Sequence, residues 1–332
     1  MDIAILGCGG VSYVHSQSYL SRSDVTIRAV VDIQYDRAEK LAETHNAKAY
    51  TSVEEMLANE KIDMVDICLP TYLHEEMAIK ALNRKINVLC EKPMALTAQG
   101  AKNMANTAKN NGVFLMIAHV IRFWPEYVYL KKIYDEKPYG ELLQVNFSRL
   151  GTFPDWSFEN WMLDFNESGG AQLDLHIHDA DFIYYMLGKP KAVSSISREE
   201  AGIISYISTQ YIYDNHTVVT ADCGWFKTTY PFVMSFSAVF ENATLIYNGG
   251  KLTLIEDKLE GKVIDLNPDK ENVQTQINIS DIAGYFNEID YFIDCIRTKT
   301  PPLKALPELS VESLEMVLAE IESGKAGKII AL

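Results

Sequence analysis

The stretch DLHIHDAD, residues 174–181, places two histidines and three aspartates within eight positions. Side chains of these types can bind a metal ion, because imidazole and carboxylate are common ligands. They can also move protons near neutral pH, since histidine titrates there. A third interpretation is the polar face of an ordinary helix. The element that carries the side chains decides among the three.

The apolar residues around this stretch predict a helix, closed by a glycine and a proline. An apolar stripe recurs at intervals of three and four, at Leu173, Ile177, Ala180, Tyr184 and Leu187. At about 100° per residue, Asp174, His178 and Asp181 fall within one narrow arc. His176 and His178 point to nearly opposite sides, whereas a His-x-His metal site requires a strand, so we predict no metal. Asp174 as a helix cap and His178 as a buried, hydrogen-bonded histidine remain the alternative to a catalytic pair.

A glycine-rich turn opens the chain. The segment AILGCGGVS carries Gly7, Gly9 and Gly10 between a predicted strand and a predicted helix. Gly7 permits the tight turn, Gly9 lets the backbone approach a pyrophosphate, and the start of the helix supplies oriented N–H groups. The third position of this fingerprint holds Ser12 in place of glycine. The turn therefore predicts a dinucleotide site.

Asp32 strengthens that prediction, because it ends the strand TIRAVVD about 20 residues beyond the turn. A carboxylate there accepts hydrogen bonds from ribose hydroxyls and repels a 2′-phosphate, which favours NAD over NADP. Arg37 lies close enough in sequence to keep NADP open, and a simple turn role for Asp32 is the other alternative.

A second motif, INVLCEKPMA, is an apolar strand that ends in Glu91, Lys92 and Pro93. The carboxyl end of a parallel strand is where such a sheet binds ligands, and proline fixes the backbone there. An isolated EKP is more typical of a solvated loop. Its occurrence together with the glycine turn favours a functional lysine.

Two patterns of secondary structure must position these residues. From residue 3 to about 118, short apolar runs alternate with segments of helical period, as in a parallel sheet with crossover helices. From about 141, longer strands of period two follow, FVMSFSAVFE among them, and YNGGKLTLIE has a hairpin turn. We therefore predict two domains, residues 1–120 and 121–332, the second built on a mainly antiparallel sheet.

Composition limits the partners. The net charge of −15 disfavours nucleic acid and anionic membranes. No apolar run is long enough to span a bilayer and no signal peptide is recognisable. The five cysteines are scattered among apolar residues, as Cys8, Cys68, Cys90, Cys223 and Cys295. They indicate reduced, buried thiols and a cytoplasmic protein.

The order GCGGVS, VVD, CLPTYLH, CEKPMA, RFWP and GGAQLDLHIHDAD resembles the glucose-fructose oxidoreductase and inositol dehydrogenase (Gfo/Idh/MocA) family over nearly the whole chain. The resemblance implies an amino-terminal Rossmann domain with a doubly wound parallel sheet and an α+β domain with a large open sheet. It also implies NAD(P)-dependent chemistry on sugars, polyols or cyclitols, with Lys92, Asp174 and His178 at the reacting hydroxyl and the histidine as proton acceptor.

The residues expected at the site form three groups. The expected catalytic residues are Lys92, Asp174 and His178. The expected cofactor-binding residues are Gly7, Gly9, Gly10, Val11, Ser12, Asp32, Pro70, Thr71, Glu91 and Lys92. The expected substrate contacts are Arg122, Trp156, Trp161 and His176, where His176 replaces a glycine common in the family. For Arg122 and the tryptophans, structural anchoring is the alternative.

The expected function is a cytoplasmic NAD-dependent dehydrogenase acting on CH–OH groups, a homodimer or homotetramer through its second domain. A hydride leaves the alcohol carbon while His178 accepts the hydroxyl proton and Lys92 stabilises the charge on oxygen. A redox-neutral glycosidase that uses bound NAD, a dinucleotide-binding sensor, and an imine or tetrapyrrole reductase are the alternatives.

Overall fold

The computed structural model describes residues 1–200, 203–256, 260–266 and 282–332. The chain forms two compact units. One consists of Met1–Phe123 with Asn272–Val311, and the other of Trp124–Glu271 with Glu312–Leu332. The division after Phe123 lies close to the boundary expected after residue 120. The sequence did not indicate that a late segment joins the first unit.

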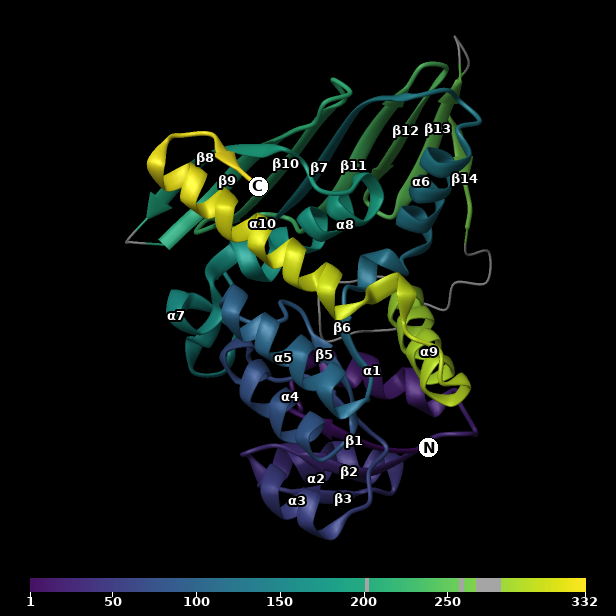
Figure 1. Ribbon diagram of the computed structural model, residues 1–332, viewed down its shortest axis with the longest axis vertical. Coiled ribbons are helices and arrows are strands. Elements are labelled where there is room, and N and C mark those ends of the chain that lie inside the picture. The colour runs from purple at the N-terminus through teal and green to yellow at the C-terminus, as the bar shows by residue number, and fades with distance from the viewer. Residues whose placement is uncertain (201–202, 257–259, 267–281) are drawn as a thin grey trace. The chain divides into compact units, whose positions relative to one another are not determined.

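The first unit contains a six-stranded parallel sheet with the order β3-β2-β1-β4-β5-β6, shown in Figure 1. Its strands are β1 (Asp2–Leu6), β2 (Thr26–Val31), β3 (Lys48–Tyr50), β4 (Met64–Ile67), β5 (Asn87–Glu91) and β6 (Leu115–Ala118). Its helices are α1 (Gly10–Leu20), α2 (Tyr35–His45), α3 (Val53–Asn59), α4 (His74–Asn83), α5 (Ala98–Asn111) and α9 (Ala283–Thr298). This order is that of a doubly wound dinucleotide-binding sheet. The predicted Rossmann architecture is confirmed.

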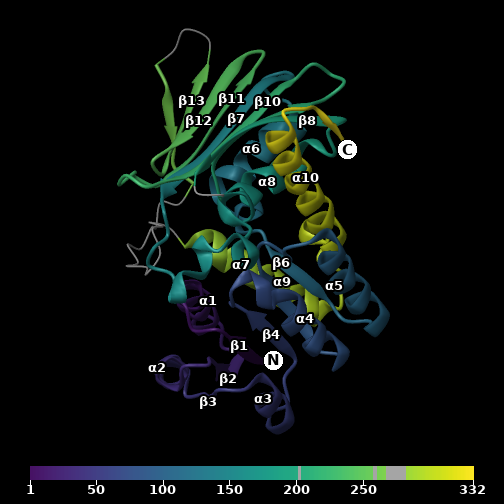
Figure 2. The ribbon, with the colours of Figure 1, turned by 90° about the vertical axis from the view of Figure 1, so that its left-hand side faces the viewer.

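Burial explains why these segments form a parallel sheet. Every residue of β4 and β6 is buried, as expected for strands covered on both faces. Helix α9 packs beside α1 (Figure 2), and its Ile289, Phe292 and Ile293 join Ile3 and Ile5 in one core cluster. A long-range hydrophobic contact therefore attaches this helix to the sheet domain.

The second unit contains a nine-stranded sheet with the order β14-β13-β12-β11-β7-β10-β9-β8-β15. Its strands are β7 (Leu142–Thr152), β8 (Ala192–Glu200), β9 (Ile203–Ile212), β10 (Val218–Phe226), β11 (Val233–Phe240), β12 (Ala243–Asn248), β13 (Lys251–Glu256), β14 (Lys262–Ile264) and β15 (Ile330–Ala331). Apart from the parallel pair β7 and β10, the described pairings are antiparallel. The predicted hairpin joins β12 to β13, where Gly249 and Gly250 have positive φ and Asn248 pairs with Lys251. The mainly antiparallel sheet is confirmed.

Helices cover one face of this sheet (Figure 1). They are α6 (Pro125–Glu136), α8 (Ile177–Leu187) and α10 (Pro307–Ala326), which enters this unit at Glu312. Tyr127 of α6 and Phe182 of α8 meet edge to face with ring centroids 5.0 Å apart. Tyr127 also contacts Phe147 of β7 and Phe236 of β11. This aromatic layer fixes the helices on the sheet.

The structure also bears on the cysteines and on membrane-spanning helices. The five cysteines are buried and unpaired, as predicted. Among the described helices, none has the length and apolar character that crossing a bilayer requires.

Candidate functional site

The glycine turn has the geometry that a dinucleotide requires. Gly7 has φ of +90° and its N–H donates to the carbonyl of Val31 at 2.8 Å. A Cβ atom on Gly7 would lie 2.4 Å from the carbonyl oxygen of Cys68, so only glycine fits. A Cβ atom on Gly9 would meet no atom within 4 Å, and α1 begins at Gly10 without a side-chain cap. Open space in front of uncapped N–H groups fits a pyrophosphate.

Ser12 and Asp32 are ordered around this turn. Ser12 is fully buried and its hydroxyl donates to the carbonyl of Gly9 at 2.6 Å, so it takes the small-residue position expected of it. The carboxylate of Asp32 accepts the N–H of Cys8 at 2.9 Å and that of Gln34 at 2.8 Å. These two bonds hold the carboxylate beside the turn. Burial, followed by the charge of Asp32, raises the pKa of the Cys8 thiol to about 12, which makes this thiol a poor nucleophile.

The remaining residues of this unit that are expected to bind the cofactor follow two neighbouring strands. Pro70 and Thr71 come after β4, and Lys92 comes directly after β5, where its side chain is partly exposed. Because β4 and β5 pair in parallel, their carboxyl ends adjoin. Glu91 differs, because its carboxylate is buried and lies 3.1 Å from the imidazole of His15. The structure therefore gives no support for a direct contact between the Glu91 side chain and the dinucleotide.

One group of described residues could in principle bind a metal, since the ligand atoms of His15, Asp66 and Cys68 lie within 4.8 Å of one another. These atoms already bond to each other: Nδ1 of His15 lies 3.0 Å from Asp66, and the Cys68 thiol lies 3.6 Å from both. The hydroxyl of Tyr19 donates to Asp66 at 2.8 Å. All four residues are buried, so the cluster is best described as an internal hydrogen-bond network.

In the second unit, the segment with the two histidines is helical but not uniformly α-helical. A π-turn covers Gln172–His176 and leads into α8. Asp174 is partly exposed and His178 is 9% exposed, whereas Asp181 is fully buried. A π-turn inserts one extra residue into a helix and therefore changes the directions of the side chains around it. Such turns are frequent at functional sites. Of the predicted arc, Asp174 is partly exposed, whereas His178 is largely buried and Asp181 is completely so.

Three buried contacts hold this helix in place. Nε2 of His176 lies 2.5 Å from Oε2 of Glu320 on α10. The guanidinium of Arg149 on β7 donates to both oxygens of Asp179, at 2.9 and 2.8 Å. The hydroxyl of Ser313 donates to Asp181 at 2.7 Å. The residues on either side of His178 therefore anchor the helix, and they fix which side of it carries Asp174 and His178.

The four residues expected to contact substrate differ in their exposure and partners. His176 is fully buried behind the helix, so the structure gives no support for a contact with substrate. Arg122 is 2% exposed, and its guanidinium donates to the carbonyl of Lys304 at 2.7 Å, which matches the anchoring alternative. Trp161 is partly buried. Trp156 is 69% exposed, and it remains a candidate contact.

Sequence reasoning missed the buried charges that support these elements. They are His15, Asp66, His74, Arg149, Asp179, Glu288 and Glu320. One signal was available in the sequence, because Asp66 and Arg149 interrupt the apolar strands MVDICLP and VNFSRLG. A charge within a buried strand requires a partner.

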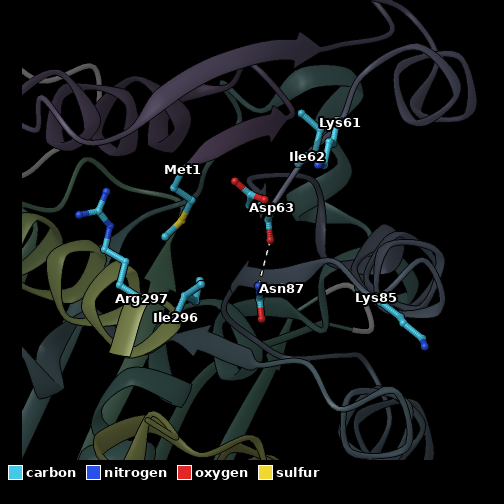
Figure 3. A pocket seen from close by; sticks show the side chains of 8 residues that line it. All are labelled: Met1, Lys61, Ile62, Asp63, Lys85, Asn87, Ile296 and Arg297. Carbon is cyan, nitrogen blue, oxygen red and sulfur yellow. Dashed lines mark hydrogen bonds between the residues drawn. The ribbon is translucent and has the colours of Figure 1, made fainter. Parts of the chain in front are cut away.

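A separate hollow lies at the opposite, amino-terminal ends of the strands of the first unit (Figure 3). Met1, Asp63, Asn87 and Arg297 are among its lining residues, and the Asn87 amide donates to the carbonyl of Asp63 at 3.0 Å. Dinucleotides bind at the carboxyl ends of such strands, so this hollow is not the cofactor site.

Comparisons with known proteins agree with this geometry. Residues 1–119 match the family described as "Oxidoreductase family, NAD-binding Rossmann fold", and residues 127–246 match the "GFO/IDH/MocA C-terminal domain". The chain is 32% identical to a D-glucoside 3-dehydrogenase of Escherichia coli over 260 residues, which are 76% of this chain and 69% of that protein. It is also 30% identical to a 2,7-anhydro-N-acetylneuraminate hydratase of Escherichia coli over 195 residues, 57% of this chain and 51% of that protein.

The structure of a levoglucosan dehydrogenase in complex with NADH and levoglucosan superposes with a TM-score of 0.85 at 17% identity, over 100% of this chain and 99% of that one. This likeness shows the fold. The chain spans about half the length of several curated relatives that it matches. From the two matching domains and the 32% identical relative, we conclude that this chain belongs to the Gfo/Idh/MocA oxidoreductase family, with an NAD-binding Rossmann domain.

Proposed function

We propose that this protein is an NAD-dependent dehydrogenase that acts on a CH–OH group of a sugar, polyol or cyclitol. The observation that carries the proposal is the anchored helix, which holds a partly exposed Asp174 one turn before a largely buried His178 and buries the charged residues around them. The uncapped glycine turn supplies the second requirement, a place for the dinucleotide. Relatives named D-glucoside 3-dehydrogenase and myo-inositol 2-dehydrogenase support the substrate class.

Each residue has a definite role in the proposed reaction. When bound, NAD supplies the acceptor for the hydride that leaves the alcohol carbon. His178 accepts the hydroxyl proton as the C–O bond becomes a carbonyl, and it returns that proton in the reverse direction. Lys92 stabilises the negative charge that develops on the oxygen, and Asp174 orients the imidazole or the substrate hydroxyl.

We propose NAD rather than NADP as the preferred cofactor. The Asp32 carboxylate is fixed beside the glycine turn by the N–H groups of Cys8 and Gln34. It therefore accepts hydrogen bonds from ribose hydroxyls and repels a 2′-phosphate.

A second candidate is a redox-neutral reaction that uses bound NAD transiently. Two relatives are named 2,7-anhydro-N-acetylneuraminate hydratase, and a hydratase exchanges water without net oxidation. In such a reaction the hydride returns to the substrate, so NADH does not accumulate.

The absorbance of NADH separates these functions. Purified protein is mixed with NAD and a panel of inositols, aldoses and alditols, and parallel samples are analysed for products by mass spectrometry. Growth of NADH with one substrate class is the expected result. Product formation without NADH would contradict the dehydrogenase and support the redox-neutral reaction. Binding of NAD without any product would indicate a sensor.

We also propose self-association through the large sheet and a cytoplasmic location. Ile196 on β8 and Val218 on β10, which are 79% and 46% exposed, are candidate contacts for a partner subunit. Light scattering coupled to size-exclusion chromatography is expected to give a dimer or tetramer, and a monomer would contradict the proposal.

A further inference from the structure

The turn that carries Lys92 is held from inside the first unit by two buried histidines that play no part in the proposed chemistry. His15 lies on α1, directly after the glycine turn, and is fully buried. His74 begins α4 and is 1% exposed. Neither residue was singled out in the sequence.

His15 lies between two carboxylates. Its Nδ1 atom is 3.0 Å from Oδ2 of Asp66, and its Nε2 atom is 3.1 Å from Oε1 of Glu91. Burial by itself would lower the pKa of His15, but the interactions with Asp66 and Cys68 together outweigh burial, and the pKa lies well above its usual value. Burial and then the charge of Glu91 raise the pKa of the neighbouring Glu288 well above its usual value. The ring is therefore hydrogen-bonded to Asp66 through Nδ1 and lies within ion-pair distance of Glu91 through Nε2.

Glu91 transmits this contact to the backbone of the lysine. Its second oxygen, Oε2, accepts the N–H of Lys92 at 3.1 Å. His15, Glu91 and the main chain of Lys92 thus form one continuous chain of polar contacts. The orientation of the Glu91 carboxylate, and with it that of the Lys92 amide, depends on the ring of His15.

His74 holds the other side of the same turn. Its Nδ1 atom lies 2.8 Å from the carbonyl oxygen of Pro93, and its Nε2 atom lies 2.8 Å from the carbonyl oxygen of Leu69. Burial lowers the pKa of His74, and the hydrogen bonds to the two carbonyls act in the opposite direction. The ring lies between the two carbonyls and ties the segment after β4 to the segment after β5.

From these contacts we infer that His15 and His74 are positioning residues for Lys92, acting through the carboxylate of Glu91 and the carbonyl of Pro93. This role depends on the reaction proposed above, because a fixed lysine matters only where its ammonium must meet a developing charge. A displacement of about 1 Å at such a group can lower turnover about 100-fold.

Two amide substitutions at each position test the inference, because asparagine places its amide near Nδ1 and glutamine places its amide near Nε2. His15→Gln keeps a donor for Glu91, whereas His15→Asn keeps one only for Asp66. His74→Asn keeps a donor for Pro93, whereas His74→Gln keeps one only for Leu69. Glutamine should therefore be the better substitute at position 15, and asparagine the better substitute at position 74.

The measurements are kcat, KM for substrate, NAD affinity and hydrogen exchange of residues 87–96 by mass spectrometry. His15→Asn and His74→Gln are expected to lower kcat about 10- to 100-fold relative to their matched amides, with NAD affinity changed less than about threefold. The same two variants should speed exchange in residues 87–96. If the histidines had a purely structural role, the variants would change thermal stability, but the better amide for kcat would not differ between the two positions.

Equal turnover and equal exchange for the two amides at both positions would overturn the inference. The His74 pair decides the question if a variant at the fully buried position 15 does not fold. If the wild-type protein forms no product with any substrate, the proposed function fails, and the exchange comparison still tests whether the histidines hold the Lys92 turn.

Discussion

The imidazole of His176 lies 2.5 Å from the carboxylate of Glu320, and both side chains are fully buried although 144 residues separate them in the chain. This pair joins the helix that carries His178 to α10. A histidine at a position where the family commonly has glycine is thus explained by an internal partner rather than by substrate.

The pair has a predictable pH dependence. Burial alone would lower the pKa of His176, but the charge and hydrogen bond of Glu320, together with the charges of Asp179 and Asp222, outweigh burial, so the pKa is raised above the usual 6.5. Because the folded protein holds this proton more tightly than the unfolded chain, the stabilisation is complete below about pH 6.5 and is lost as pH rises through the raised pKa. Glu320→Gln should cost about 1–3 kcal/mol at low pH and less at high pH, as measured by urea unfolding. A cost that grows with pH would contradict this assignment, and the exposed Glu322→Gln is the control.

A second prediction concerns the buried pair of Arg149 and Asp179. Their side chains are 4% and 1% exposed, so the loss of either partner leaves an uncompensated charge. Asp179→Asn and Arg149→Met should each lower the free energy of unfolding by about 3–5 kcal/mol, and the double variant by less than the sum. Additive losses would show that the two charges do not depend on each other. The ion pair of the partly exposed Lys131 with the exposed Asp135 supplies the control, and Asp135→Asn should change stability very little.

The role of His178 is tested by His178→Gln. Loss of a general base is expected to lower kcat about 100- to 10,000-fold, while NAD binding stays unchanged because the dinucleotide residues lie in the other unit. His216→Gln, at an exposed position, is the control and should leave kcat unchanged. Wild-type turnover in His178→Gln would exclude the acid/base role.

The glycine turn offers a matched pair of substitutions. Gly7→Ala places a Cβ atom 2.4 Å from a carbonyl oxygen at φ of +90°, so we expect a clear loss of thermal stability. Gly9→Ala meets no protein atom within 4 Å, so it should fold normally and weaken NAD binding about tenfold or more, as measured by calorimetry. Normal NAD affinity in Gly9→Ala would show that the pyrophosphate does not approach this glycine.

Asp32 governs the expected choice between the two dinucleotides. Asp32→Asn removes the negative charge while keeping a similar shape, so the ratio of NADP affinity to NAD affinity should rise about tenfold. Calorimetric titration at fixed ionic strength measures both affinities, and Asp36→Asn, exposed in the first turn of α2, is the control. Tighter binding of NADP by the wild-type protein would refute the assignment.

Much of this protein follows from the sequence alone because its signals are local. The period of the apolar residues separates buried parallel strands such as β4 from the alternating strands of the second unit. The glycines at positions 7, 249 and 250 occupy positive-φ positions where the sequence predicts tight turns. Lys92 follows β5, as the predicted strand end required.

The tertiary structure decided what depends on distant partners. The π-turn before α8, the attachment of α9 to the first unit, and the inward direction of His176, Glu91 and Asp181 have no local signal. A buried charge is stable only when an opposite charge or a hydrogen bond meets it, and here that partner comes from far along the chain, as Glu320 does for His176. The sequence therefore determined which residues have the required chemistry, and the packing determined which of them face outward and which hold the others in place.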